Sequence, residues 1–337
     1  ALINLDKYDV KILPQRWGQT PESFLDENEE WLYLKDYLIL KLTEQPDVWI
    51  QHTIPNEFQR VGKYNIGLTA GIETTLCKAE WIEGLNRMDL IIGSSKHTLN
   101  TFNRSTYEKR EKNSGQTVGH VKVEKPMEVI FEGLDTEIFK PEKSTFKLNN
   151  IKEDFNFLFV GHWMQGNIGE DRKNVGLLIK LFLELFKNRK KAPGLILKVS
   201  TGSTSNMDKL SILRKINDIR KTVIANRLPN IYIVHGDITN KELNFLYNNK
   251  KIKAMVSLTK GEGFGRPLLE FTMTKKPVIA SGWSGHTDFL DKDLSMLLNG
   301  ELKKVHASAV NDWIIKDSEW FNVDIQTFAN GIMIIYN

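Results

Sequence analysis

Cysteine is nearly absent from this chain of 337 residues, in which Cys77 is the only one. A single cysteine excludes an internal disulfide and a thiolate zinc site, and it fits a reducing cytosol. The seven histidines are scattered, without His-x-x-x-His or a comparable metal-ligand spacing. No run approaches the ~20 apolar residues of a membrane span, since the best candidate, residues 176–186, contains Lys180 and Glu184. We therefore expect an amphipathic helix there, and a cytoplasmic protein without a bound metal.

Length and charge set the scale of the molecule. The sequence is 41% hydrophobic and 26% charged, which is typical of a globular protein, and its 337 residues are enough for two domains. The net charge of +4 is compatible with anionic nucleotide substrates or an anionic membrane surface and requires neither. We expect no nucleic-acid partner, and the oligomeric state stays open.

The first half of the sequence alternates short apolar runs with helical patterns, which is typical of a parallel α/β sheet. Expected helices include residues 31–42 and 95–103, the second opened by Ser94 and Ser95 as an N-cap. Residues 107–125 are charged and weakly patterned, so we expect an exposed excursion, either a solvated loop or a contact with anionic lipid at the membrane periphery. Strands are expected at residues 8–13, 47–51, 64–69, 90–93 and 128–131.

A second alternating series follows a linker through residue 150. We therefore predict an N-terminal Rossmann-like domain over residues 1–148, a C-terminal one over 149–320 and a helical segment over 321–337. Two such sheets with a cleft between their strand ends form the usual ligand site, although this fold alone names no reaction. The strands of the second series are expected at residues 155–160, 195–199, 231–234, 254–258 and 278–280.

The most informative run is Lys-Gly-Glu-Gly-Phe-Gly-Arg-Pro-Leu-Leu-Glu at residues 260–270. It places Glu262 and Glu270 eight positions apart, across a glycine turn that leads into a helix between two strands. Gly263 and Gly265 let backbone N–H groups approach a ligand, and a helix N-terminus presented in this way attracts phosphate. We expect Glu262 in the loop beside the anion and Glu270 about one turn into the helix.

This run resembles the Glu-x7-Glu motif of retaining glycosyltransferases with the GT-B fold, the large group 1 or family 4-like class. The loop at residues 281–285 supports the resemblance, which implies an α/β protein with two Rossmann-like domains facing a central cleft. In that family the first glutamate faces the donor sugar and the second holds the ribose hydroxyls, roles that fall by resemblance on Glu262 and Glu270. The other interpretation is a surface loop and a solvated helix glutamate.

Residues 132–141 also resemble this family, whose first domain ends in Asn-Gly-Val-Asp-x-x-x-Phe-x-Pro. Glu132 replaces the asparagine. Family members have a first strand and a glycine-rich acceptor-side loop ahead of the helix tail that residues 1–7 resemble. The sequence lacks both, so we expect either a fragment or a chain whose N-terminus departs from the family.

Two cations precede the helix expected after residue 174. Arg172 and Lys173 oppose the helix dipole at its N-terminus, a conflict that disappears if a diphosphate lies there. The family holds the donor phosphates with an arginine soon after the strand glycine and a lysine at the helix start. Lys173 matches that lysine, whereas His162 occupies the arginine position, so Arg172 is a candidate substitute.

Other donor contacts are expected where strands of the second series end. Thr201 and Gly202 follow one strand and either contact nucleotide or sugar or form a polar turn. Residues 231–236 resemble the family segment that packs on the base, largely through backbone, with His235 as a candidate base reader. Asp288 is expected to cap the helix after it. The full donor-binding set is Glu270, Arg172, Gly263, Phe264, Gly265, Thr201, Gly202, Val234 and Gly285.

Two residues of the first half are candidates for the acceptor side. Relatives place a histidine after the strand that matches residues 64–69; this chain has none there, but Glu73 is close by. His52 ends the preceding strand, where it could face the cleft or simply be hydrogen-bonded structure.

The resemblance implies transfer of a sugar from a UDP-, GDP- or ADP-linked donor to a hydroxyl acceptor, which could be a glycan, a lipid or a small molecule. Glu262 and Lys173 are the expected catalytic residues, and the resemblance implies retention of anomeric configuration without a cofactor or a metal. A nucleotide-sugar epimerase of the same fold and a non-catalytic nucleotide-sugar-binding protein remain alternatives. A sugar phosphorylase would need a pyridoxal-binding lysine, for which no motif is found.

Overall fold

The computed structural model describes residues 2–15, 23–27, 29–111 and 114–337. The chain forms two compact units, one of Ala1–Trp49 with Arg60–Asn65 and the other of Ile50–Gln59 with Ile66–Asn337.

Two elements expected in the first unit are absent from its described residues. Residues 8–13 form no strand, because Ile12 makes only an isolated parallel bridge to Leu38 and a single strand without a ladder partner is not stable. The helix expected at 31–42 was also wrong. A 3₁₀ helix covers Glu29–Tyr37 and ends where Leu38 enters that bridge. The unit also contains a 3₁₀ turn at Ile3–Leu5 and α1 (Phe24–Glu27).

The smaller sheet follows the expected parallel series. Its strands β1 (Val48–His52), β2 (Tyr64–Thr69), β3 (Leu90–Gly93) and β6 (Met127–Val129) lie in the order β1-β2-β3-β6. Helix α2 (Ala79–Leu85) lies between β2 and β3, and α3 (Lys96–Arg104) follows β3. Ser95 is the N-cap of α3, as predicted, since its hydroxyl accepts the Thr98 N–H at 3.1 Å.

The described residues of 107–125 are mostly exposed, as expected, but they are not irregular. They contain an antiparallel hairpin of β4 (Tyr107–Arg110) and β5 (Thr117–Val121). Tyr107 and Val121 pack against a buried core, and the Tyr107 hydroxyl donates to the Cys77 carbonyl. This anchoring at the base of the hairpin orders a segment whose remaining side chains are mostly exposed.

The larger sheet has the doubly wound topology of a nucleotide-binding fold. Its strands lie in the order β12-β11-β10-β7-β8-β9, and every neighbouring pair is parallel. The direction of the strand order reverses between β7 and β10, where such folds bind ligands. The strands are β7 (Asn156–His162), β8 (Gly194–Ser200), β9 (Ile231–Val234), β10 (Ile252–Ser257), β11 (Val278–Ser281) and β12 (Met296–Leu298), of which only β12 was not expected.

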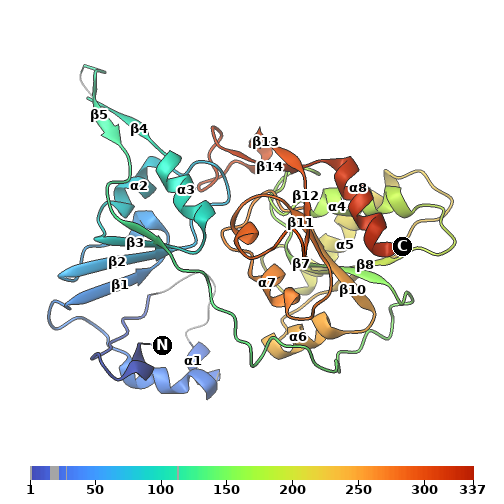
Figure 1. Cartoon of the computed structure of the whole chain (residues 1–337), viewed down its shortest axis with the longest axis horizontal. Coiled ribbons are helices and arrows are strands. Elements are labelled where there is room, and N and C mark those ends of the chain that lie inside the picture. The colour runs from blue at the N-terminus through green and yellow to red at the C-terminus, as the bar shows by residue number, and fades with distance from the viewer. Residues whose placement is uncertain (1, 16–22, 28, 112–113) are drawn as a thin grey trace. The chain divides into compact units, whose positions relative to one another are not determined.

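Both faces of this sheet are apolar. Successive side chains of a strand point to opposite faces, so a continuous apolar run places apolar side chains on both. Phe157 and Phe159 of β7 belong to one buried cluster and Leu158 to the other. Figure 1 shows helices α4 (Val175–Phe186), α5 (Asn206–Lys221) and α8 (Ile325–Tyr336) beside one face and α6 (Asn240–Asn248) and α7 (Arg266–Thr272) beside the other. Within the described ranges, no helix combines the length and the apolar content that crossing a bilayer requires.

The C-terminal segment, expected to be helical over residues 321–337, contains a shorter helix, α8. Residues 321–323 complete strand β14 (Glu319–Val323), which pairs antiparallel with β13 (Gly300–Lys304), and α8 begins only at Ile325. Trp320 on β14 is fully buried in the cluster that also contains Trp81 and Ile82, and the ladder with β13 keeps residues 319–323 extended. The domain boundaries given above stay a prediction.

Candidate donor-binding and catalytic site

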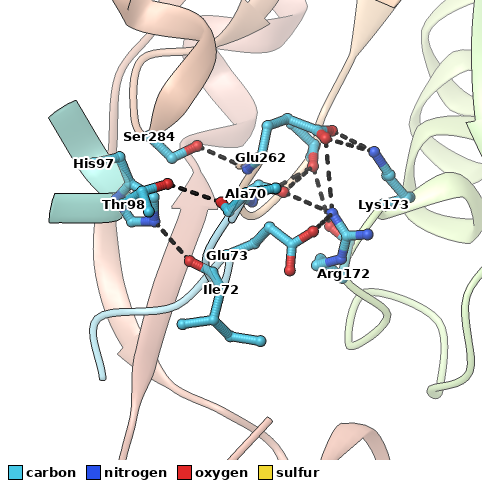
Figure 2. A network of polar contacts seen from close by, with 11 residues as sticks. Ala70, Ile72, Glu73, His97, Thr98, Arg172, Lys173, Glu262 and Ser284 are labelled. Carbon is cyan, nitrogen blue, oxygen red and sulfur yellow. Dashed lines mark hydrogen bonds and ion pairs between the residues drawn. The ribbon is translucent and has the colours of Figure 1, made fainter. Parts of the chain in front are cut away.

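The switch point of the larger sheet brings together the two loops that carry the predicted site. The loop after β7 carries Arg172 and Lys173, and the loop after the adjacent β10 carries Glu262. Lys173 Nζ lies 2.6 Å from both carboxylate oxygens of Glu262. Arg172 Nη1 lies 3.7 Å from Glu262 Oε2 and 3.0 Å from Glu73 Oε1 (Figure 2). Two cations and two carboxylates thus form one network.

This network is largely shielded from water. The side chains of Lys173 and Glu262 are 14% and 11% exposed. Burial alone would raise the pKa of Glu262, but the charges of Lys173 and Arg172 outweigh it and hold that pKa at about 2. Glu262 is therefore a carboxylate at every physiological pH, which suits it to favour positive charge and not to donate a proton.

The backbone of the Glu262 loop is held by the loop after β11. Ser284 Oγ accepts the Glu262 N–H at 2.8 Å, and the Gly285 N–H donates to the Glu262 carbonyl at 2.9 Å. A Cβ on Gly285 would lie 2.0 Å from the Gly263 carbonyl oxygen, and one on Gly263 would lie 2.7 Å from the Ala70 oxygen. Both glycines are therefore required by close packing of the chain on itself, whether or not a ligand also approaches them.

Glu270 lies one turn into α7, with its carboxylate almost fully buried. Tyr247 donates its hydroxyl to Glu270 Oε2 at 3.0 Å, and Arg266 lies 3.2 Å from Oε1. Burial and the neighbouring Glu270 raise the pKa of Tyr247, so this hydroxyl keeps its proton and remains a donor. Neither partner was expected from the sequence, although the four-residue spacing of Arg266 and Glu270 on a helix is a recognisable signal.

The loops after β8 and β9 are tied to a shared acid at the start of α5. Asp208 accepts the Thr201 N–H at 3.1 Å, and its other oxygen lies 2.9 Å from His235 Nε2. Burial acts to raise the pKa of Asp208, but hydrogen bonds from Thr201 and His235 outweigh it, so the pKa is lowered. Since a carboxylate only accepts, His235 Nε2 carries the proton. Asp208 was not expected from the sequence, and it links Thr201 to His235. Val234, another expected donor contact, is the last residue of β9, just before His235.

Several glycine and aromatic positions of the predicted donor set have a local explanation. Gly202 and Gly265 have φ of +131° and +94°, which disfavours any residue with a Cβ. Phe264 is 4% exposed and packs against Phe289 and Phe131, with ring centroids 5.1 and 6.2 Å away. The ring of Phe264 is therefore a buried packing contact of the loop that carries Glu262.

A cavity of about 250 Å³ has two of the expected donor contacts, Arg172 and Thr201, in its wall. Residues between Ala309 and Trp320, which follow β13, complete this wall and were not among the expected site residues. The other lining residues are Met164, Gln165, Ala309, Asn311, Ile314 and Trp320.

The acceptor-side candidates lie in different places. Glu73 joins the charge network through Arg172. His52 is exposed at the end of β1, within electrostatic reach of Glu132, whose pKa is raised by burial and which also feels the charges of Arg266 and Glu270. The structure therefore places Glu73 against the same guanidinium that faces Glu262, and His52 at the exposed end of β1.

Residues after β11 connect this site to α3. The sequence predicted that Asp288 caps the helix after it, and this was wrong. Asp288 Oδ2 instead accepts the Lys96 N–H at the start of α3, at 2.8 Å. His286 Nε2 lies 2.7 Å from the Ser281 carbonyl, and burial lowers its pKa, so the ring is neutral. In the described parts of the chain, no group of three or more His, Cys, Asp or Glu side chains is arranged to hold a metal ion.

Comparison with solved structures places the two sheets in a known class, the GT-B fold with two Rossmann-like domains. Sucrose-phosphate synthase from Thermosynechococcus elongatus is 13% identical, with a TM-score of 0.55 over 93% of this chain and 68% of that chain. OtsA in its apo form is 13% identical, with a TM-score of 0.52 over 79% of this chain and 69% of that chain. A trehalose-6-phosphate structure from E. coli, bound with UDP-2-fluoro glucose, is 15% identical, with a TM-score of 0.51 over 79% and 65%.

The likeness to glycosyltransferases of this class confirms the predicted α/β fold, and at these identities it defines the fold alone. Neither a protein-family model nor a curated protein sequence matches the chain.

Proposed function

We propose that this chain is a retaining glycosyltransferase that moves a sugar from a nucleotide diphosphate sugar to a hydroxyl acceptor. The observation that carries the proposal is the buried cluster at the switch point, in which Lys173 and Arg172 surround Glu262. Glu270 follows eight residues later on α7. A structure of the same fold holds UDP-2-fluoro glucose, which supports a nucleotide sugar as the ligand class.

The proposed reaction exchanges one bond at the anomeric carbon. The bond from this carbon to the diphosphate oxygen breaks, and a bond to the acceptor oxygen forms on the same face. The acceptor proton goes to the departing phosphate oxygen, so a nucleoside diphosphate and a glycoside are the products. Lys173 and Arg172 would stabilise the negative charge on the diphosphate, and Glu262 would favour the positive charge that develops on the sugar ring.

Incubation of the intact chain with radiolabelled UDP-, GDP- and ADP-sugars, with and without mixed hydroxyl acceptors, tests the proposal. Label transferred to an acceptor is the expected result. Label that remains on a nucleotide sugar of changed configuration would indicate an epimerase, and donor binding without any turnover would indicate a binding protein. A preceding thermal-shift screen selects the donor, since a ligand stabilises the native state by mass action.

Replacing Glu270 by alanine is expected to weaken nucleoside diphosphate binding. The lost carboxylate would remove charge-assisted hydrogen bonds to the ribose, which corresponds to roughly 50-fold in Kd for about 2.3 kcal/mol. Isothermal calorimetry measures this effect. Glu137→Ala, which removes an exposed carboxylate paired with Lys140, is the matched control. Equal affinity of the Glu270 variant and the parent would show that the ribose assignment is wrong.

Turnover is expected to continue without a divalent metal, because Lys173 and Arg172 can neutralise the donor phosphates. The rate should stay within about twofold of its initial value after treatment with a chelator, a difference of only ~0.4 kcal/mol in activation free energy. Initial rates before and after dialysis against EDTA provide the measurement. Loss of activity that manganese restores would contradict this prediction.

A further inference from the structure

Ser284 has a backbone conformation that side chains rarely adopt. Its φ of +87° and ψ of −159° fall in a region occupied almost exclusively by glycine. The other non-glycine residues with positive φ in the described chain have φ between 50° and 61°, in or near the less strained left-handed region. Strain of this kind persists only where surrounding contacts hold it, and it is concentrated at functional sites.

Within the described residues, the hydrogen bonds of Ser284 go to the Glu262 loop and to its own turn. Ser284 Oγ accepts the Glu262 N–H at 2.8 Å (Figure 2). The next residue, Gly285, donates its N–H to the Glu262 carbonyl at 2.9 Å. The Ser284 carbonyl accepts the Thr287 hydroxyl at 2.7 Å. Both backbone polar groups of Glu262 are therefore satisfied by two consecutive residues, and Ser284 is only 6% exposed, which leaves little room for competing water.

A glycine at position 284 would remove the strain but would also remove the hydroxyl that binds the Glu262 amide. The chain thus keeps a strained residue where an unstrained one is available, and the only polar group gained is that hydroxyl. The side chain of Glu262 extends from this fixed backbone to Lys173 Nζ, 2.6 Å away, so a shift of the loop would move the carboxylate relative to its cation.

We propose that Ser284 is a positioning residue for Glu262. Its hydroxyl fixes the amide of Glu262, and through it the orientation of the carboxylate toward the reacting sugar. This inference rests on the proposed glycosyl transfer. A site fixed before the substrate arrives needs no reorganisation during the reaction, and a loss of orientation lowers kcat more than donor affinity.

Ser284→Gly and Ser284→Ala separate this role from a purely structural one. Glycine relieves the strain, so its melting temperature should equal or exceed that of the parent, whereas alanine retains the strain and should melt lower. Both variants should lose about 10-fold in kcat, the equivalent of one net hydrogen bond, with the KM for the donor nearly unchanged. Lys275→Gly is the matched control, because Lys275 has φ of +60° but lies on the surface after α7. It should match the parent in kcat.

Amide hydrogen exchange provides a readout that does not depend on turnover. The Glu262 amide should be protected in the parent and in Lys275→Gly, and should exchange at least about 10-fold faster in both Ser284 variants, since its hydrogen-bond acceptor is gone. Unchanged protection of this amide in Ser284→Gly would overturn the proposal, and so would a parental kcat in that variant. A parent that transfers no sugar from any donor would overturn the proposed function and with it the role in orienting catalysis. In that case, protection of the Glu262 amide would by itself show whether the Ser284 hydroxyl holds the Glu262 loop.

Discussion

Glu262→Gln is expected to lower kcat by ~10²–10³, the scale for losing one preorganised electrostatic partner of a transition state. Glutamine keeps the size of the side chain and one acceptor oxygen, but it replaces the other oxygen with an NH2 donor and removes the charge that would favour the positive sugar ring. The KM for the donor should change little, because Glu270, Lys173 and Arg172 still bind the nucleotide and phosphates. Steady-state kinetics with saturating acceptor measure both parameters.

Glu184→Gln is the matched control for this variant. Glu184 on α4 also forms a lysine pair, with Lys187 Nζ 2.6 Å from its carboxylate, but this pair is more than one-third exposed and lies away from the described site. It should retain the parental kcat. The pKa of about 2 adds a second check, since lowering the pH from about 7 to about 5 should leave Glu262 ionised and should not reproduce the loss. A glutamine variant with near-parental kcat would reduce Glu262 to a structural residue of the loop.

Lys173→Met is expected to reduce the stability of the protein by about 3 kcal/mol, because it leaves the buried Glu262 carboxylate without its principal partner. Arg172 remains 3.7 Å away and compensates in part, which places the effect at the lower end of the range for breaking a buried pair. The same change removes the cation assigned to the donor phosphates. Urea unfolding reports the stability loss, and calorimetry with a nucleoside diphosphate reports the loss of affinity.

A double variant distinguishes this explanation from a general packing defect. In Lys173→Met combined with Glu262→Gln, neither partner is charged, so most of the lost stability should return relative to Lys173→Met alone. Simple addition of the two single effects would show that the two side chains are not coupled. The pairing in Figure 2 would then not contribute to stability.

The sequence was sufficient to predict five of the six strands of the larger sheet and to name Lys173 and Glu262 as site residues, but it predicted neither the strand order nor the contact between these two side chains. Both residues follow strands of a doubly wound sheet, and adjacent strands deliver their following loops to the same edge. The apolar runs of these strands are buried on both faces, so their pattern needs no knowledge of distant parts of the chain.

Other features depend on partners that the sequence does not reveal. Residues 8–13 have a strand-like pattern, yet a strand forms only where a neighbouring strand completes its ladder, and only Ile12 finds one. Asp208 lies 27 positions before His235, so their contact emerges only once β8, β9 and α5 are packed. The positive φ of Ser284 is likewise unexpected for a residue with a side chain, because it is imposed by contacts with Glu262.

The most direct test of the account is the anomeric configuration of the product, observed by proton NMR while the intact chain converts a nucleotide sugar and an acceptor. We expect a glycoside with the configuration of the donor, formed together with one equivalent of nucleoside diphosphate, and a much slower reaction in Glu262→Gln. A product of inverted configuration, or a donor that is consumed without any glycoside, would contradict the proposed reaction at this site.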